Sequence, residues 1–187
     1  VEIVKEFPLD KIYMPKVVHT SKTYEDLLVN IKNADLKVIA AKPGLTIDLD
    51  PGLKAEFLSP AGSSYDSLNN YSAVLKLTYK ETSFLFTGDA ETEAEEEMLA
   101  SGADLASTVL KVGHHGSNTS TSPLFLNTIN PEVAVISVGA DNSYGHPHGE
   151  VIDRLQQAGV SVFRTDLHGT VVITSDGREI AVLTEKQ

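Results

Sequence analysis

The sequence predicts a strand-rich α/β domain in which two packed sheets carry helices on their outer faces. Short apolar segments fill the middle of the chain, and segments of strand and helix type then alternate up to its end. In addition, three apolar strands each run into a polar loop that holds an aspartate or histidines. A length of 187 residues suffices for one domain with a sizeable core, and we expect residues 1–187 to form a single domain.

The first part of the chain is expected to contain short strands and one helix. Thr23 opens the helix, because Asp26 three residues later completes a short capping box and apolar residues then share one face. Pro-Gly pairs at 43–44 and 51–52 separate the strands that follow. The expected elements are strands over residues 1–4 and 11–14, a helix over residues 23–33, and strands over residues 37–41, 45–49 and 53–58.

The rest of the chain begins with a turn-rich loop over residues 60–70 and then gains helices. Residues 71–79 and 83–87 predict a hairpin, and Asp176-Gly177 is a strong turn signal for a second hairpin. Gly102 and Gly159 each close a helix. The expected elements are helices over 91–101, 123–128 and 150–158, strands over 108–112, 132–138 and 160–164, and a final hairpin of 171–174 with 179–183.

Composition limits the classes of function. The net charge of −11 disfavours a nucleic-acid binder, because phosphate contacts need clustered lysine or arginine. The acidic run at residues 91–97 is best interpreted as a solvated helix face. The absence of cysteine excludes disulfides and cysteine-based zinc sites, so a metal would need histidine and carboxylate ligands. No stretch of 18 apolar residues is present.

Four of the six histidines fall in two short loops that follow strands. His114 and His115 follow the strand at 108–112, and His146 and His148 follow the strand at 132–138. Packing does not readily explain such pairs, whereas a metal site does. Asp89 ends a third strand; it is interpreted either as a metal ligand or as the cap of the acidic helix. His19 and His168 lack metal-spaced neighbours and are not assigned to a site.

A site of this kind suits zinc, manganese or iron, with Asp89, His115 and His146 as a plausible partial ligand set. Asp89 would bridge two cations about 3.5–4 Å apart, and a metal-bound water would ionise near neutral pH. Ser117 is interpreted as a turn cap or a phosphate contact rather than as a nucleophile. Asn70 either lines the site or serves the turn before the next strand.

These motifs resemble the metallo-β-lactamase superfamily, and within it the hydrolase domain of DNA-internalisation competence proteins of the ComEC family. The resemblance covers residues 69–175 and is carried in order by NNYSAVLKL, FLFTGD, VLKVGHHGSNTSTS, VISVGADNSYGHPHGEVIDRL and FRTDLHGTVVI. It implies a four-layer αββα sandwich with a two-metal site. It further implies that Asp89 is the bridging aspartate and that His115 and His146 are metal ligands, while the roles of their neighbours His114 and His148 stay unseparated.

One departure from the family pattern is important, because the metal motif His-x-His-x-Asp-His occurs nowhere in the chain. Residues 7–15 resemble the segment that shortly follows this motif, and Val1 is not an initiator methionine. We therefore expect an N-terminally truncated fold that begins just past the motif. The zinc or manganese site is then incomplete or empty, the isolated chain is inactive, and exposed sheet edges favour a homodimer.

The leading functional prediction is the C-terminal part of a metal-dependent phosphodiesterase or nuclease that acts on single-stranded DNA during uptake. Asp89 and His114 are the predicted catalytic residues, and Ser117, His148 and Asn70 are the predicted substrate contacts. One alternative is a hydrolase of small phosphodiesters, similar to phosphorylcholine esterase, and another is a non-catalytic scaffold domain. The resemblance implies a soluble, extracytoplasmic domain attached to the membrane-embedded remainder of a bacterial protein; a secreted or cytoplasmic stand-alone hydrolase is the alternative.

Overall fold

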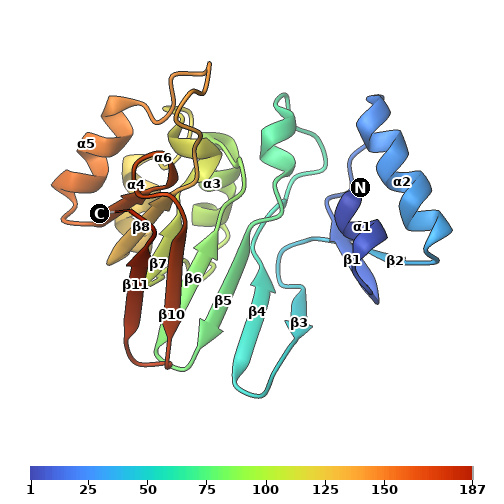
Figure 1. Cartoon of the computed structure of the whole chain (residues 1–187), viewed down its shortest axis with the longest axis horizontal. Coiled ribbons are helices and arrows are strands. Elements are labelled where there is room, and N and C mark those ends of the chain that lie inside the picture. Colours follow the sequence, from blue (N-terminus) through green and yellow to red (C-terminus); the bar gives the residue numbers. More distant parts are fainter. Residues whose placement is uncertain (187) are drawn as a thin grey trace. The chain divides into compact units, whose positions relative to one another are not determined.

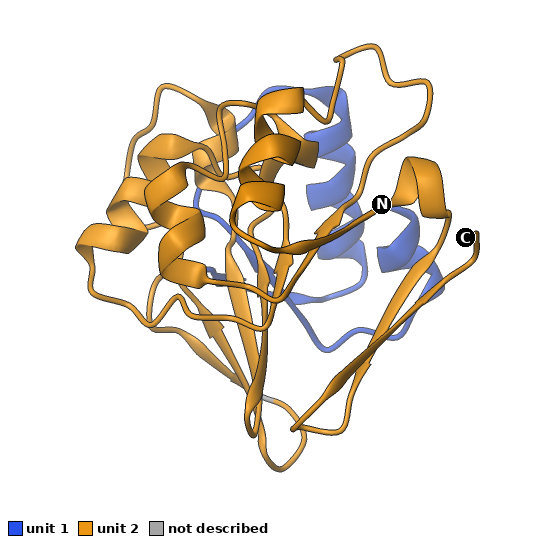
Figure 2. Ribbon diagram, turned by 90° about the vertical axis from the view of Figure 1, so that its left-hand side faces the viewer, with its two compact units in different colours: residues 1–41 blue, residues 42–187 orange. Residues whose placement is uncertain are grey.

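The computed structural model describes residues 1–186, apart from the side chain of residue 48. The chain divides into two compact units, Val1–Ala41 and Lys42–Gln187, which Figure 2 distinguishes by colour. The expectation that residues 1–187 form one domain stays a prediction.

The first unit is a small α/β element with a two-stranded parallel sheet. It contains α1 (Glu2–Glu6), β1 (Lys11–Met14), α2 (Lys22–Asn33) and β2 (Lys37–Ala40), and β1 pairs with β2. The strand expected over residues 1–4 is wrong, because this segment is helical and Lys5 Nζ lies 3.3 Å from Glu2 Oε1 one turn away. The capping residue of α2 is Ser21, whose Oγ accepts a hydrogen bond from Tyr24 N, and not Thr23.

The second unit is built on a seven-stranded mixed sheet (Figure 1). The strands lie in the same order in the sheet as in the chain. The first four are antiparallel to their neighbours, and from β6 onwards each neighbouring pair is parallel. The strands are β3 (Thr46–Asp48), β4 (Leu53–Phe57), β5 (Leu75–Tyr79), β6 (Thr82–Phe86), β7 (Val109–Lys111), β8 (Val133–Ile136) and β9 (Ser161–Arg164).

Three helices supply the main core on one face of this sheet. Because strand side chains alternate between faces, Leu85, Leu110 and Ala134, which are paired across β6, β7 and β8, point the same way. All three are fully buried and belong to one apolar cluster with side chains of the helices. These helices are α3 (Thr92–Ala100), α4 (Pro123–Ile129) and α5 (Gly149–Gln157).

The opposite face of the same strands carries the hairpin of β10 (Val171–Ser175) and β11 (Ile180–Thr184) (Figure 1). The next residues along the strands, Phe86, Lys111 and Val135, are also aligned across the sheet and point to this side. They line a cavity of about 230 Å³ together with Val171 and Ile173 of β10. The hairpin therefore packs against this second apolar face of the sheet.

The predicted α/β fold class is confirmed, and most predicted elements occur within a few residues of their expected bounds. Besides α1, three short helical segments were not expected: the 3-10 turn Leu68–Tyr71, the 3-10 turn Gly113–Gly116 and α6 (Thr165–His168). They have four residues each, which is too short for a helical periodicity to show. Among the described residues, no helix is long and apolar enough to cross a membrane.

Candidate metal centre

The predicted site residues follow three neighbouring parallel strands of the second unit. Asp89 comes after β6, His114 and His115 come after β7, and His146 and His148 come after β8. Because parallel strands end at the same edge of a sheet, the three loops meet there. The ring centres of His114 and His146 are 5.5 Å apart, and Asp89 lies beside His115.

The HHGS turn has an unusual backbone. His114 and His115 both adopt positive φ values, 46° and 55°, which residues with a Cβ rarely adopt. Gly116 follows at φ 82°, and a Cβ built on it would lie 2.6 Å from the Cβ of Pro147. The Gly116 carbonyl also accepts a hydrogen bond of 2.9 Å from His148 N. Glycine at this position therefore lets the histidine loop after β8 pack directly against the histidine turn after β7.

His115 is oriented toward the aspartate. Its Nε2 lies 3.6 Å from Asp89 Oδ1, while its Nδ1 lies 2.6 Å from the carbonyl oxygen of Ser137. A carbonyl oxygen accepts only, so Nδ1 carries a proton, and a neutral imidazole in this orientation presents its Nε2 lone pair on the Asp89 side. This arrangement, with one ring nitrogen on a backbone carbonyl, is typical of histidines that ligate metals.

His114 faces a different carboxylate. Its Nδ1 lies 3.3 Å from Glu91 Oε1 and 3.4 Å from Thr119 Oγ1. Burial by itself would raise the pKa of Glu91, but hydrogen bonds from Ser67, Asn69 and Thr119, together with the attraction of His114, bring it below the ordinary value. Glu91 is thus an anion at neutral pH. Sequence reasoning missed it, because it lies in an acidic run that resembles an ordinary solvated helix face.

His146 lies between the other imidazoles, with its ring centre 5.5 Å from that of His114 and 5.0 Å from that of His148. Burial, followed by the repulsion of the neighbouring histidines, lowers the pKa of His146, and Asp89 only partly opposes this. The ring is therefore neutral at pH 7, and neutral imidazole is the form that binds metals. Its loop is held by Asn142, which donates to the His146 carbonyl at 2.7 Å.

The predicted substrate contacts Ser117, His148 and Asn70 take part in local hydrogen bonds. Ser117 is buried with its Oγ 3.0 Å from Thr119 Oγ1, and His148 Nδ1 accepts a hydrogen bond from Asn118 N at 3.3 Å. Asn70 is 3% exposed; its Oδ1 accepts from Glu91 N and its Nδ2 donates to Glu93 at the start of α3. Contact of these three side chains with a substrate remains a prediction.

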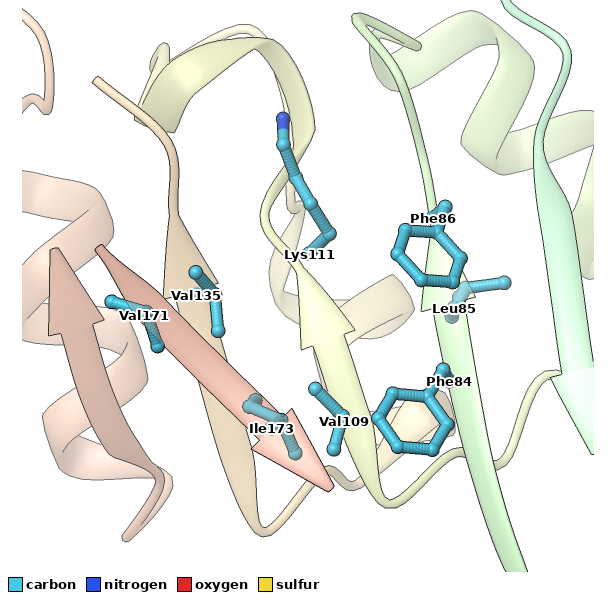
Figure 3. Close-up of a pocket in the computed structure, with 8 residues that line it drawn as sticks. All are labelled: Phe84, Leu85, Phe86, Val109, Lys111, Val135, Val171 and Ile173. Atoms are coloured by element: carbon cyan, nitrogen blue, oxygen red, sulfur yellow. The ribbon is translucent and has the colours of Figure 1, made fainter. Parts of the chain in front are cut away.

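A lysine that sequence reasoning also missed extends along the sheet face beneath the site. Lys111 belongs to β7, lines the apolar cavity and donates to the Val112 carbonyl at 2.9 Å (Figure 3). Burial lowers the pKa of Lys111, and the nearby Asp89 opposes that shift. The one sequence signal was a charged residue in the middle of the apolar strand VLKV.

The donors present fit part of a metal site. Two ligands of a tetrahedral ion at about 2.0–2.1 Å lie roughly 3.4 Å apart, close to the 3.6 Å between His115 Nε2 and Asp89 Oδ1. In the part of the chain that the structure describes, however, no group of three or more His, Cys, Asp or Glu side chains could hold a metal ion. Asp89 and His115 thus have the residue types and the spacing of two metal ligands, but two ligands alone do not form a complete metal site.

Comparison with known proteins gives consistent relatives. Residues 2–140 match the sequence profile of the Metallo-beta-lactamase superfamily. The chain is 33% identical to ComE operon protein 3 of Bacillus subtilis over 90% of its own length, and 42% identical to Competence protein ComA of Neisseria gonorrhoeae over 64%. It is 38% identical to Recombination protein 2 of Haemophilus influenzae over 64%. The chain spans only 22%, 18% and 15% of the lengths of these three relatives.

Proposed function

The chain belongs to the metallo-beta-lactamase superfamily, and from this we propose that it forms part of a metal-dependent phosphodiester hydrolase of the competence type. The predicted kinship with competence proteins is confirmed by its relatives, which include ComE operon protein 3 and Competence protein ComA. The observation that carries the proposal is the orientation of His115, with Nδ1 on the Ser137 carbonyl and Nε2 turned to Asp89.

In this proposal Asp89, His115 and His146 hold metal, zinc or manganese. A bound ion of this kind supplies a Lewis acid and a water that ionises near pH 7. The remaining ligands come from a His-x-His-x-Asp-His sequence of the whole protein, since these 187 residues contain none. The neutral state of His146 supports its role as a ligand.

His114 is proposed to act on the substrate rather than on the metal. Glu91 Oε1 lies 3.3 Å from His114 Nδ1, close enough to accept a hydrogen bond from the Nδ1–H group. This pairing sets the tautomer and leaves Nε2 to exchange a proton with, or donate to, a phosphate oxygen. The arrangement repeats the carboxylate–imidazole pairing found where histidine works as an acid or base.

We propose that the substrate is single-stranded DNA. The domain formed by this chain is further proposed to be attached to the membrane-embedded remainder of the whole protein and to lie on its extracytoplasmic side. Two observations keep other functions open to test. The net charge of −11 favours a small phosphodiester over DNA. The lack of a group of three metal-holding side chains in the described residues favours a non-catalytic domain.

The test uses the whole protein that contains this chain, with Asp89→Asn and His115→Gln variants and Glu132→Gln as a surface control. Metal content is measured by mass spectrometry, and hydrolysis of single-stranded DNA and of a small phosphodiester is followed with added Mn²⁺ or Zn²⁺. We expect tightly bound metal and hydrolysis of DNA in the wild type, with both lost in the two site variants. Metal binding without DNA cleavage contradicts the nuclease, and absence of metal leaves the non-catalytic domain.

A further inference from the structure

Tyr144 is the most exposed of the tyrosines and phenylalanines that the structure describes, with 78% of its surface accessible. It lies two residues before His146, and the two rings are stacked, with centres 5.8 Å apart and planes at 25°. His146 in turn meets His114 edge-on at 5.5 Å. An aromatic series therefore leads from the solvent, through Tyr144 and His146, to the histidines of the candidate metal centre.

The loop that carries Tyr144 is held by specific hydrogen bonds. Asn142 donates through Nδ2 to the carbonyls of Gly139 at 2.9 Å and His146 at 2.7 Å, and its Oδ1 accepts from His146 N at 3.0 Å. The end of the loop is fixed by the bond from His148 N to the Gly116 carbonyl. Tyr144 is therefore presented to solvent by a preformed loop. Its position costs little conformational entropy when a ligand binds.

Resting on the proposed function, we propose that Tyr144 is a specificity-determining residue that stacks a nucleobase of single-stranded nucleic acid next to the cleaved phosphate. One face of its ring covers His146, and the high exposure of the side chain leaves the other face to a planar group. Bases stack on tyrosine regardless of sequence, since every base has a π-face. A small phosphodiester without a ring gains nothing from this contact.

Stacking also suits the charge of this protein. A nucleic-acid ligand gains affinity from phosphate contacts or from base contacts. Residues 139–148 contain Asp141 and no lysine or arginine, and the chain as a whole carries a net charge of −11. Phosphate contacts at this loop are therefore unfavourable, whereas stacking involves no charge. In this proposal the loop contacts the bases of the ligand, and the metal centre contacts the phosphate.

The test measures binding of fluorescently labelled dT12 and of an abasic 12-mer to the 187-residue chain by anisotropy, at low salt with EDTA present. The variants are Tyr144→Phe, Tyr144→Leu and Tyr144→Ala, with the exposed Leu124→Ala on α4 as a control. We expect Tyr144→Phe and Leu124→Ala to keep wild-type affinity for dT12. Tyr144→Leu and Tyr144→Ala should lose roughly 5- to 100-fold, while binding of the abasic strand stays unchanged in all variants.

Four results overturn the proposal: no binding of dT12 to the wild type, equal binding of dT12 and the abasic strand, wild-type affinity in Tyr144→Ala, or a Tyr144→Phe variant as weak as Tyr144→Ala. The last of these would assign the effect to the hydroxyl group instead of the ring. Because EDTA excludes hydrolysis, this result is independent of the metal test. Base-dependent binding without cleavage by the whole protein would reject the hydrolase and keep the stacking role.

Discussion

At the scale of single residues, two adjacent histidines with the same local sequence environment have different partners. His115 Nδ1 bonds the Ser137 carbonyl and its Nε2 faces Asp89, whereas His114 Nδ1 faces Glu91. The positive φ values at both residues turn the two side chains to different neighbours. Strained backbone of this kind persists where the surrounding structure fixes it, and it is frequent at functional sites.

This difference predicts that substitutions of the two histidines have different effects on metal binding. In the whole protein, His115→Gln should weaken zinc or manganese binding by roughly 100-fold or more. Removing only the residue that hydrogen-bonds to a metal ligand already lowers metal affinity by roughly 10- to 100-fold, and this variant removes the ligand itself. His114→Gln should leave metal affinity within about 3-fold and reduce turnover by roughly 100-fold or more. Metal competition titrations and initial rates measure the two effects, and equal losses of affinity would contradict the assignment.

Gly116 gives a second prediction at the residue scale. Alanine there would combine φ 82° with a Cβ 2.6 Å from the Cβ of Pro147, so Gly116→Ala should lower the free energy of unfolding by about 1–3 kcal/mol. Gly139→Ala is the matched control, because a Cβ at Gly139 meets nothing within 4 Å and its φ is unexceptional. Urea unfolding of both variants measures the difference. Equal free energies of unfolding would show that the loop accommodates the added Cβ without destabilising the fold.

At the scale of elements, the loop between β7 and α4 is fixed by a buried acid of α3. Glu95 is 1% exposed; its carboxylate accepts hydrogen bonds from Thr121 N and, at 2.9 Å, from Ser122 N at the start of α4. On the other side, Arg154 of α5 donates to the Thr121 carbonyl at 2.5 Å. Three helices thus hold the segment that follows the HHGS turn.

This burial raises the pKa of Glu95, against the hydrogen bonds of Ser122 and Thr121 and the attraction of Arg154. In the folded state Glu95 therefore keeps its proton to higher pH than in the unfolded chain. Protonated Glu95 therefore contributes its full stabilisation below the pKa that it has in the unfolded chain. This contribution is lost as pH rises through its pKa in the folded state. Relative to Glu95→Gln, the wild type should lose free energy of unfolding as pH increases above the ordinary glutamate pKa of about 4.5.

The measurement is urea unfolding of the wild type and Glu95→Gln between pH 4 and pH 8. Glu96→Gln is the control, because Glu96 is an exposed neighbour on the same helix. The difference between wild type and Glu95→Gln should change with pH in the stated direction, whereas Glu96→Gln should follow the wild type. A constant difference for Glu95→Gln would mean that the carboxyl group has no raised pKa.

Elements also show which parts of the fold were predictable. The apolar runs of β6, β7 and β8 and the Asp176-Gly177 turn are local signals, and the structure confirms the strands and the hairpin. The helix α1 was missed because five residues carry no periodicity. The partners of the histidines, Ser137 and Glu91, lie 22 and 23 residues away from His115 and His114, so no local pattern could assign them.

At the scale of the whole molecule, the chain consists of two compact units, and every candidate site residue lies in Lys42–Gln187. The order of strands explains this concentration. From β6 to β9 all neighbours are parallel, so successive loops return to one edge and place residues 89, 115 and 146 together. The unit Val1–Ala41 has its own parallel pair, β1 and β2, and contributes none of these residues.

A bound metal should therefore protect the site loops of the larger unit more than the rest of that unit. A ligand that binds only the folded state stabilises it by about 2.7 kcal/mol at a concentration 100 times its Kd. With manganese added to the whole protein, amide hydrogen exchange should slow at Asp89, at the HHGS turn and in the loop of His146 more than in the rest of Lys42–Gln187. The Asp89→Asn variant should show no change on metal addition. Manganese that leaves exchange at Asp89, the HHGS turn and the His146 loop unchanged would contradict a metal centre built on these loops.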